Sequence, residues 1–261
     1  MEIIIVPTPT EVGRVAAARV ASVVAMKPSA VIGLATGSSP QGLYSDLKRR
    51  VQAGDISFVD AHGFALDEYV GISLDHPESY ASVITRDVVV PLGFDPARVQ
   101  VPDGRANDLE SAARAYDAAI RASGGIDVQI LGIGTNGHIG FNEPTSSFAS
   151  RTRIKTLAPL TREANARFFD SIEQVPMHCM TQGLGTILEA RQLLLVAQGS
   201  AKAKAVAAAI EGPLSSFVPG SALQLHQHAT VVLDEAAAAE LQLADYYRYT
   251  YANKPTWQLD Q

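Results

Sequence analysis

Short apolar runs alternate with amphipathic or alanine-rich stretches along most of the chain. The apolar runs predict strands at 2–6, 30–35, 62–68, 98–103, 127–134, 153–157, 192–198 and 229–234. The stretches between them predict helices at 9–25, 40–53, 78–92, 107–123, 161–170, 200–211 and 235–247. Strands that alternate with helices are typical of a parallel sheet covered on both faces. The sequence therefore predicts an α/β fold with an open, mostly parallel sheet and helices on both faces.

Local patterns support this interpretation. Asn107 precedes a helical pattern as an expected N-cap, with Glu110 as its capping-box partner. The run "LLLVA" at 193–197 lacks polar alternation, as expected for a strand buried on both faces. No linker, internal repeat or composition shift divides the 261 residues. We expect one domain spanning 1–261.

Charge and composition exclude several classes of protein. The net charge of −6 and the lack of a basic run argue against a nucleic-acid surface, although a small anion remains compatible with a few placed cations. The beginning of the chain shows no signal-peptide pattern, and no apolar stretch reaches the ~18 residues of a membrane span. The single cysteine, Cys179, is expected to be a buried apolar residue. We expect a cytoplasmic protein without nucleic-acid or membrane partners.

The stretch "LGIGTNGHIGFNEP" contains the glycine spacing of a dinucleotide-binding fingerprint at Gly132, Gly134 and Gly137. That fingerprint requires a helix directly after it and an acidic residue about 20 positions later. Here another glycine and a proline follow, and the downstream stretch at 151–155 is basic. We therefore expect no dinucleotide cofactor.

Three loops at expected strand ends are candidates for a site, because ligands of open α/β sheets bind there. "TGSSP" at 36–40 suits a phosphate cradle, but equally suits a strand-to-helix turn with a serine cap. Asp67 is either a general base or a helix cap, and Glu68 a surface or structural partner. His138 and Glu143 share one glycine-rich loop, where a carboxylate could orient the imidazole.

Cations able to meet a phosphate occur on later helices, at Arg162, Arg167, Lys202 and Lys204. Such side chains are most often merely solvated, and Lys202 is favoured because it lies just past a strand end. The six histidines are scattered, and "HQH" at 226–228 has no carboxylate nearby in sequence. We expect no metal site.

Together these motifs resemble the glucosamine-6-phosphate deaminase family. The resemblance runs from about residue 30 to about residue 230, and its specificity comes from several motifs in the same order: "GLATGSSPQGLY", "LDEYVG", "HPESY", "LGIGTNGHIGFNEP", "SRTRIKTL", "TREANARFF" and "SALQLH". It implies conversion of glucosamine 6-phosphate and water to fructose 6-phosphate and ammonia in amino-sugar catabolism, without cofactor or metal.

The resemblance also implies residue roles. Asp67 matches the base that moves a proton between C2 and C1, His138 the residue that opens the pyranose ring, and Glu143 its supporting partner. The phosphate-binding positions match Thr36, Gly37, Ser38, Ser39, Arg167 and Lys202. The chemistry suggested by the loops themselves agrees with these roles.

The chain departs from many family members at Asn136, where they carry aspartate. An amide oxygen orients an imidazole but does not stabilise imidazolium as a carboxylate does. We therefore predict that His138 stays neutral to lower pH than in a variant with aspartate at this position. We also predict that Glu143 contributes more to orienting and stabilising the imidazole than it does beside an aspartate.

Hexameric family members carry an effector site for N-acetylglucosamine 6-phosphate. Its positions match Ser146, Ser147, Arg153, Lys155 and Thr156, but a tyrosine of the C-terminal tail has no assignable counterpart here. The resemblance implies a candidate allosteric site and a candidate homo-oligomer.

Two alternatives remain. A 6-phosphogluconolactonase-like hydrolase would share the fold and the phosphate cradle, but needs no base directed at C2. A sugar-phosphate sensor module would carry a DNA-binding helix-turn-helix and could lose the acid/base residues. The presence of Asp67, His138 and Glu143 favours the deaminase.

Overall fold

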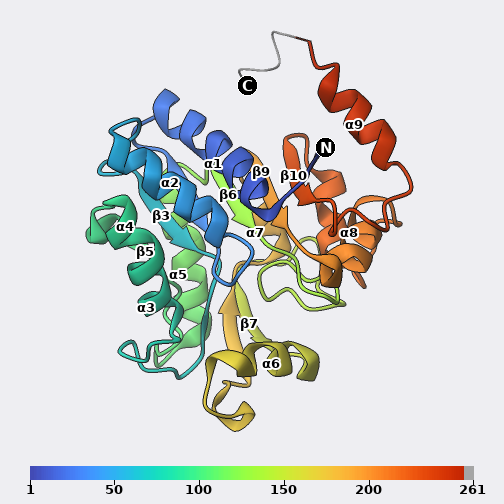
Figure 1. Cartoon of the computed structure of the whole chain (residues 1–261). Coiled ribbons are helices and arrows are strands. Elements are labelled where there is room, and N and C mark those ends of the chain that lie inside the picture. The colour runs from blue at the N-terminus through green and yellow to red at the C-terminus, as the bar shows by residue number, and fades with distance from the viewer. Residues whose placement is uncertain (256–261) are drawn as a thin grey trace.

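The computed structural model describes residues 1–255. Seven strands form one sheet in which every described pair is parallel. Their spatial order is β1 (Glu2–Val6), β10 (Ala229–Asp234), β9 (Gln192–Ala197), β6 (Val128–Leu131), β2 (Val31–Leu34), β3 (His62–Ala65) and β5 (Val99–Gln100). The expected parallel α/β sheet is confirmed (Figure 1).

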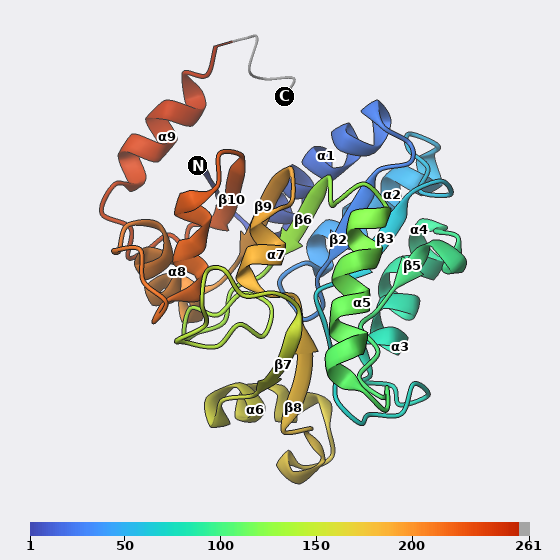
Figure 2. The same ribbon diagram turned by 180° about the vertical axis from the view of Figure 1, so that it is seen from behind.

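Helices cover both faces of this sheet, as expected. Figures 1 and 2 show α1 and α2 on one face and α5 and α7 on the other. The helices are α1 (Pro9–Met26), α2 (Gln41–Ala53), α3 (Tyr80–Ile84), α4 (Val90–Leu92), α5 (Leu109–Ala122), α6 (Pro159–Asn165), α7 (Leu184–Leu188), α8 (Ala203–Ile210) and α9 (Ala244–Ala252). A π-helical turn (Thr85–Val89) joins α3 to α4, and short 3₁₀ turns lie at Pro96–Arg98, Ala166–Phe168, Ile172–Gln174, Ser200–Lys202 and Pro219–Leu225. In residues 1–255, no helix has the length and apolarity needed to cross a bilayer.

The core lies between the sheet and its helices. Leu193–Ala197 of β9 are at most 3% exposed, and the neighbouring strand β6 is buried along its whole length. Central strands of a parallel sheet are covered on both faces, so they tolerate no polar alternation. The interpretation of "LLLVA" as such a strand is confirmed.

A second, antiparallel sheet was not expected from the sequence. It has the order β4 (Asp67–Tyr69), β8 (His178–Thr181) and β7 (Arg153–Thr156). The single strand predicted at 62–68 is wrong, because the chain changes sheets at Leu66: its N–H donates to Leu34 of β2, and its carbonyl accepts from Gln182 just after β8. Figure 2 shows β7 and β8 below the large sheet, beside α6.

The predicted cap of α5 is displaced by one residue. Asp108, and not Asn107, is the N-cap, because its carboxylate accepts the N–H and hydroxyl of Ser111. Glu110 therefore lies one position too early to close a capping box.

The helix predicted at 235–247 is also largely wrong. The carboxylate of Asp234 accepts the Ala237 N–H and holds a turn there. Helix α9 starts only at Ala244, where Glu211 accepts the N–H groups of Gln242 and Leu243. The carboxyl side chain of Glu211, which belongs to another part of the chain, thus accepts the N–H groups at the start of this helix.

The remaining differences concern lengths, one missed strand and the missed helix α7. Strand 98–103 shortens to β5, and the missed strand β8 contains Cys179, which is buried as expected.

The topology reverses direction between β2 and β6. From β2 the chain adds β3 and β5 on one side, whereas β6, β9 and β10 extend the sheet on the other. The loops that leave these two strands separate at their carboxyl ends and open a crevice. The sequence positions 36–39 and 132–138 both follow strands that flank this crevice.

Candidate active site

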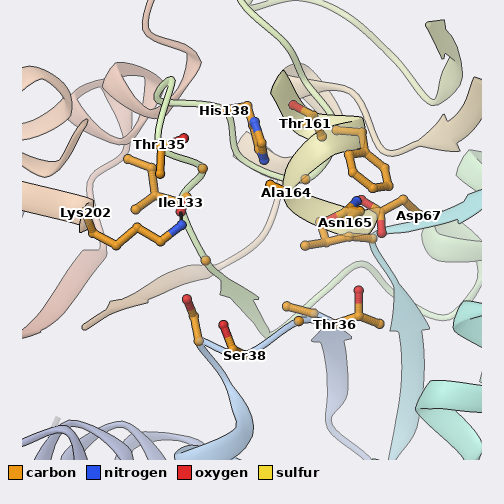
Figure 3. Close-up of a pocket in the computed structure, with 18 of the residues that line it drawn as sticks. Thr36, Ser38, Asp67, Ile133, Thr135, His138, Thr161, Ala164, Asn165 and Lys202 are labelled. Atoms are coloured by element: carbon orange, nitrogen blue, oxygen red, sulfur yellow. Dashed lines mark hydrogen bonds between the residues drawn. The ribbon is translucent and has the colours of Figure 1, made fainter. Parts of the chain in front are cut away.

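A pocket occupies the crevice between β2 and β6. It encloses about 880 Å³ of atom-free space, solvent at its mouth included. Its lining comes from the loops after β2 and β6, from β4, from α6 and the turn that follows it, and from Lys202. Figure 3 shows these side chains converging from separate elements.

The loop after β2 lines one end of the pocket with Thr36, Gly37, Ser38 and Ser39. The N-cap of α2 is Pro40, which makes no side-chain cap bond, so the interpretation of this loop as a serine cap is wrong. Ser38 and Ser39 lie at the amino end of a 13-residue helix, where an anion is favoured.

Two cations face the same end. Lys202 extends toward the pocket in Figure 3, and its Nζ lies 2.7 Å from the carbonyl oxygen of Ile133. Burial lowers the pKa of Lys202, and the nearby Arg167 lowers it further. Arg167 also lines the pocket, with its guanidinium 4.6 Å from the ring centre of Phe168. A bound anion would offset the repulsion between the two cations.

Asp67 lies at the opposite side of the pocket, on β4. Its side chain is only 5% exposed, and burial, followed by the neighbouring charge of Glu68, raises the pKa of Asp67 to about 8. Hydrogen bonds from the Phe141 N–H and the Thr181 hydroxyl act in the other direction but do not outweigh burial. A carboxyl group with a pKa this close to neutrality is suited to taking and returning a proton.

The adjacent Glu68 has a structural role. Its carboxylate accepts the N–H groups of Tyr69, Tyr80 and Ala81, two of which belong to the first turn of α3. The helix-capping carboxylate of this pair is therefore Glu68, and Asp67 is left for the pocket.

His138, Asn136 and Glu143 form a hydrogen-bonded relay in the loop after β6. The Nδ1 atom of His138 lies 2.7 Å from Asn136 Oδ1, and Asn136 Nδ2 donates to Glu143 Oε2 over 2.8 Å. Glu143 Oε1 accepts the N–H of Ala158, just before α6. Burial would raise the pKa of Glu143, but the neighbouring His138 and Thr161 side chains and the hydrogen bond from Asn136 lower it to about 2.

The backbone fixes the orientation of the Asn136 amide. The His138 N–H donates to Asn136 Oδ1, so the amide oxygen faces the histidine and the amide nitrogen faces Glu143. Because that oxygen only accepts, the proton of a neutral imidazole lies on Nδ1 and leaves Nε2 as a free base toward the pocket. The direct contact between His138 Nδ1 and Glu143 Oε2 is longer, at 3.6 Å.

The glycines of the fingerprint-like motif shape this loop. A Cβ on Gly134 would lie 2.2 Å from the His138 ring, so only glycine leaves room for the imidazole. Gly137 has φ of +85°, a left-handed conformation that turns the chain back on itself. The next helix after β6 is α6, which begins at Pro159, so the helix that a dinucleotide fingerprint requires directly after its glycines is missing from this loop.

The candidate effector residues lie outside the pocket lining. Arg153 donates to Asn142 and to Ser146, whose hydroxyl in turn donates to the Glu143 carbonyl. Lys155 shares the β7 face of Arg153, whereas Thr156 lies on the other face with its hydroxyl 3.2 Å from His178 Nδ1. Ser147 is exposed. The structure thus joins Ser146 and Arg153 directly and leaves Thr156 on the opposite side of the strand.

The other candidate cations fill structural roles or lie elsewhere. Arg162 donates to the carbonyls of Ile172 and Val175, and Lys204 is exposed and lines no part of the pocket. Within residues 1–255, no group of three or more His, Cys, Asp or Glu side chains is arranged to hold a metal ion.

Sequence reasoning missed several side chains of the pocket. Tyr80 comes from the start of α3, and Thr161 and Asn165 come from α6. Tyr80 is the last residue of the motif "HPESY", and Thr161 and Asn165 belong to "TREANARFF". These motifs contribute to the family resemblance, but their sequence does not indicate that these three residues line the pocket. Figure 3 places Asn165 beside Asp67 and Thr161 near His138.

Comparison with known proteins gives one consistent family. The model of the family described as glucosamine-6-phosphate isomerases/6-phosphogluconolactonase matches residues 8–232. Glucosamine-6-phosphate deaminases of Mycolicibacterium smegmatis and Streptomyces coelicolor are 57% and 56% identical, each over 99% of both chains. A solved monomeric glucosamine-6-phosphate deaminase superposes with a TM-score of 0.90 at 43% identity, over 92% of this chain and all of its own. A 6-phosphogluconolactonase from Trypanosoma cruzi shares the fold, with a TM-score of 0.74 at 20% identity over 92% of this chain and 97% of its own.

Proposed function

Because the chain belongs to the family of glucosamine-6-phosphate isomerases and 6-phosphogluconolactonases, we infer from its deaminase relatives that it converts glucosamine 6-phosphate and water to fructose 6-phosphate and ammonia. The enzyme is a hydrolase that acts on a carbon–nitrogen bond. The one observation that most supports this function is the buried Asp67, a carboxyl group with a pKa of about 8 across the pocket from an anion cradle.

We propose that the cradle binds the substrate's phosphate. The hydroxyls of Thr36, Ser38 and Ser39 would donate to its oxygens, and Lys202 and Arg167 would neutralise its charge. Fixing the phosphate orients the sugar along the pocket, so that C1 and C2 approach the acid/base groups.

We assign ring opening to His138. With Nδ1 bonded to Asn136, the free Nε2 accepts the proton of the anomeric hydroxyl, and a protonated imidazole then supplies a proton to the ring oxygen as the C1–O5 bond breaks. Glu143 acts through Asn136, because a carboxylate with a pKa of about 2 remains charged and holds the amide in place.

Asp67 then removes the proton from C2 of the open aldehyde, while a proton passes from the substrate's ammonium group to the aldehyde oxygen O1, which gives a neutral enolamine. The same carboxyl group returns the proton to C1, and the nitrogen is left as an imine on C2. Water adds to C2 and the C–N bond breaks, so ammonia leaves and the ketone of fructose 6-phosphate remains. One carboxyl group serves both proton transfers because C1 and C2 are adjacent.

The test is a coupled assay for fructose 6-phosphate and ammonia with the wild type and with Asp67→Asn. We expect turnover in the wild type and a loss of roughly 10²–10⁴-fold in kcat for the variant. Undiminished activity of Asp67→Asn would refute the assigned base. A parallel assay with 6-phosphogluconolactone separates the lactonase alternative, for which we expect no appreciable hydrolysis.

We also propose that Ser146, Ser147, Arg153, Lys155 and Thr156 respond to N-acetylglucosamine 6-phosphate. The direct bonds from Arg153 to Ser146, and from Ser146 to the Glu143 carbonyl, support a link from this cluster to the relay. An effector that raises activity at low substrate concentration is the expected result. Hyperbolic kinetics that the effector leaves unchanged would dispose of the proposal.

Three further properties complete the proposal. The chain acts as one domain, because strands of both sheets contribute to one pocket. It works in the cytoplasm, since a charged sugar phosphate crosses lipid poorly. One solved relative is monomeric. Cooperativity between substrate sites requires more than one site, and therefore self-association of this chain. Analytical ultracentrifugation measures whether the chain forms oligomers.

A further inference from the structure

The motif "SALQLH" begins at Ser221, and no step of the proposed reaction uses it. Ser221 is fully buried and does not line the pocket. Its Oγ accepts the N–H of Ser215 over 2.9 Å and donates to the carbonyl of the same residue over 3.0 Å. These two hydrogen bonds close residues 215–221 into a compact loop, which we call the brace loop. The Ser221 hydroxyl therefore fixes the shape of this loop and contacts no ligand.

The brace loop holds the loop after β6, which carries the relay, at two points. The Gly220 N–H donates to the Gly137 carbonyl over 2.8 Å, and the Ser216 carbonyl accepts the Thr145 N–H over 2.7 Å. The first point lies one residue before the histidine of the relay, and the second lies two residues after its glutamate. The brace loop thus binds the backbone beside both ends of the relay.

Thr145 has a backbone conformation that threonine rarely adopts. Its φ is +75°, in the left-handed region, and no other non-glycine residue within 1–255 has a positive φ. The Ser146 N–H donates to the Glu143 carbonyl over 3.1 Å, which closes a four-residue turn with Pro144 and Thr145 at its centre. Because proline cannot take a positive φ, this is a type II turn, whose third residue is normally glycine.

The hydrogen bond to Ser216 decides which turn these four residues form. Type I and type II turns differ by a flip of their central peptide, which here joins Pro144 to Thr145. A left-handed threonine is disfavoured roughly tenfold, so the turn by itself favours type I. In the folded chain the N–H of this peptide points to the Ser216 carbonyl, and a flip would direct the Pro144 carbonyl there instead. The brace loop therefore stabilises the strained form.

We propose that Ser221 is a positioning residue of the relay, because it closes the brace loop and thereby keeps Glu143 within reach of Asn136 and His138. The proposal rests on the relay of the proposed function. Glu143 is the first residue of the type II turn, and its carboxylate accepts Asn136 Nδ2 over 2.8 Å. Without a closed brace loop, the backbone on both sides of the relay loses its fixed points, and the carboxylate no longer holds the amide.

The first test is kinetic and uses rescue. Ser221→Ala should lower kcat roughly fivefold, as the loss of one net hydrogen bond would, and should change KM by less than about twofold, because another loop binds the phosphate. Adding Thr145→Gly should restore kcat to within about twofold of Thr145→Gly alone, since glycine adopts the left-handed conformation without the brace. Adding Thr145→Ala, which keeps a Cβ, should restore little. Ser29→Ala, at an exposed turn, is the matched control and should behave as wild type.

The second test observes the histidine itself. Nitrogen NMR of protein labelled with ¹⁵N-histidine reports which ring nitrogen carries the proton, and His138→Gln assigns the signal. In the wild type we expect the neutral ring to carry its proton on Nδ1, held by Asn136. In Ser221→Ala we expect a mixture of the two neutral forms, and recovery of the Nδ1–H form when Thr145→Gly is added. A merely structural serine would change stability without this glycine-dependent recovery.

An unchanged kcat in Ser221→Ala, or a loss that alanine at position 145 restores as well as glycine, would overturn the proposal. Urea unfolding shows whether each variant is folded. If Ser221→Ala does not fold, Ser215→Ala replaces it, because that variant removes only the acceptor of the Phe217 N–H and loosens the same loop less. The NMR measurement needs no turnover. A chain that makes no fructose 6-phosphate but shows the glycine-dependent recovery refutes the proposed function and leaves the role of Ser221 intact.

Discussion

Replacing Asp67 with asparagine should stabilise the fold while it removes the reaction. In the folded chain the pKa of Asp67 is about 8, against the ordinary value of 3.8 for an aspartate exposed to solvent. Folding therefore favours the protonated carboxyl group, and the unfolded chain holds fewer protons between these two pH values. Stability due to this group is fully present below about pH 4 and falls by about 1.4 kcal/mol per pH unit up to about pH 8.

The size of the effect follows from that window. Between the ordinary pKa of about 4 and pH 7 lie about three pH units, so Asp67 lowers the free energy of unfolding at pH 7 by up to about 4 kcal/mol relative to pH 4. Asparagine does not titrate, so its contribution to stability does not change with pH. Its amide accepts less well from the Phe141 N–H and the Thr181 hydroxyl, and this poorer hydrogen bonding costs about 1 kcal/mol of stability. We expect Asp67→Asn to be more stable than wild type by about 3 kcal/mol at pH 7, and less stable by about 1 kcal/mol at pH 4.

Urea unfolding at pH 4, 5, 6, 7 and 8 measures the difference directly. The exposed Asp60, replaced by asparagine, is the control for the loss of one carboxylate, and its stability difference should not vary in this way. A difference between Asp67→Asn and wild type that stays constant across the series would refute the reasoning, since the pKa of the buried base would then not be raised.

Three other changes test the site. Asn136→Asp places a second carboxylate about 2.8 Å from Glu143 Oε2, so the pair should retain a proton and the acid limb of the pH–rate profile should move; an unmoved limb would count against the relay. Lys202→Met should raise KM for glucosamine 6-phosphate by roughly 10-fold or more and weaken inhibition by inorganic phosphate, and unchanged values for both would exclude a role in phosphate binding. Glu68→Gln leaves N–H groups of α3 with a poorer acceptor, so the midpoint of urea unfolding should fall by the equivalent of about 1–3 kcal/mol, and an unchanged midpoint would contradict the capping role.

The parallel sheet could be predicted because its strands are buried on both faces and carry no competing pattern. An uninterrupted apolar run such as 193–197 fits a strand that is buried on both faces. The loops after β2 and β6 lie close together because parallel strands end at the same edge of the sheet. Apart from Arg167, the candidate residues that came together, Asp67 and His138 among them, all follow or begin strands.

The elements that could not be predicted depend on partners far away in sequence. The change of sheet at Leu66 is set by Gln182, and the start of α9 is set by Glu211. The contribution of Asn165 to the pocket likewise requires α6 to lie over β4, which no local pattern indicates. Periodicity reports the local environment of a residue, whereas these contacts are decided by tertiary packing.

The change of sheet at Leu66 fixes the distance between the phosphate cradle and Asp67, and therefore the length of substrate that can react. The cradle belongs to the large sheet and Asp67 to the small one, and Gln182 joins them through the Leu66 carbonyl and, by its side chain, the Ala65 carbonyl. The span from phosphate to base is thus set by two packed sheets and not by a loop that could adapt. A sugar phosphate one carbon shorter would reach the same cradle with its C2 hydrogen displaced from the carboxylate by about a bond length or more, and would bind without reacting.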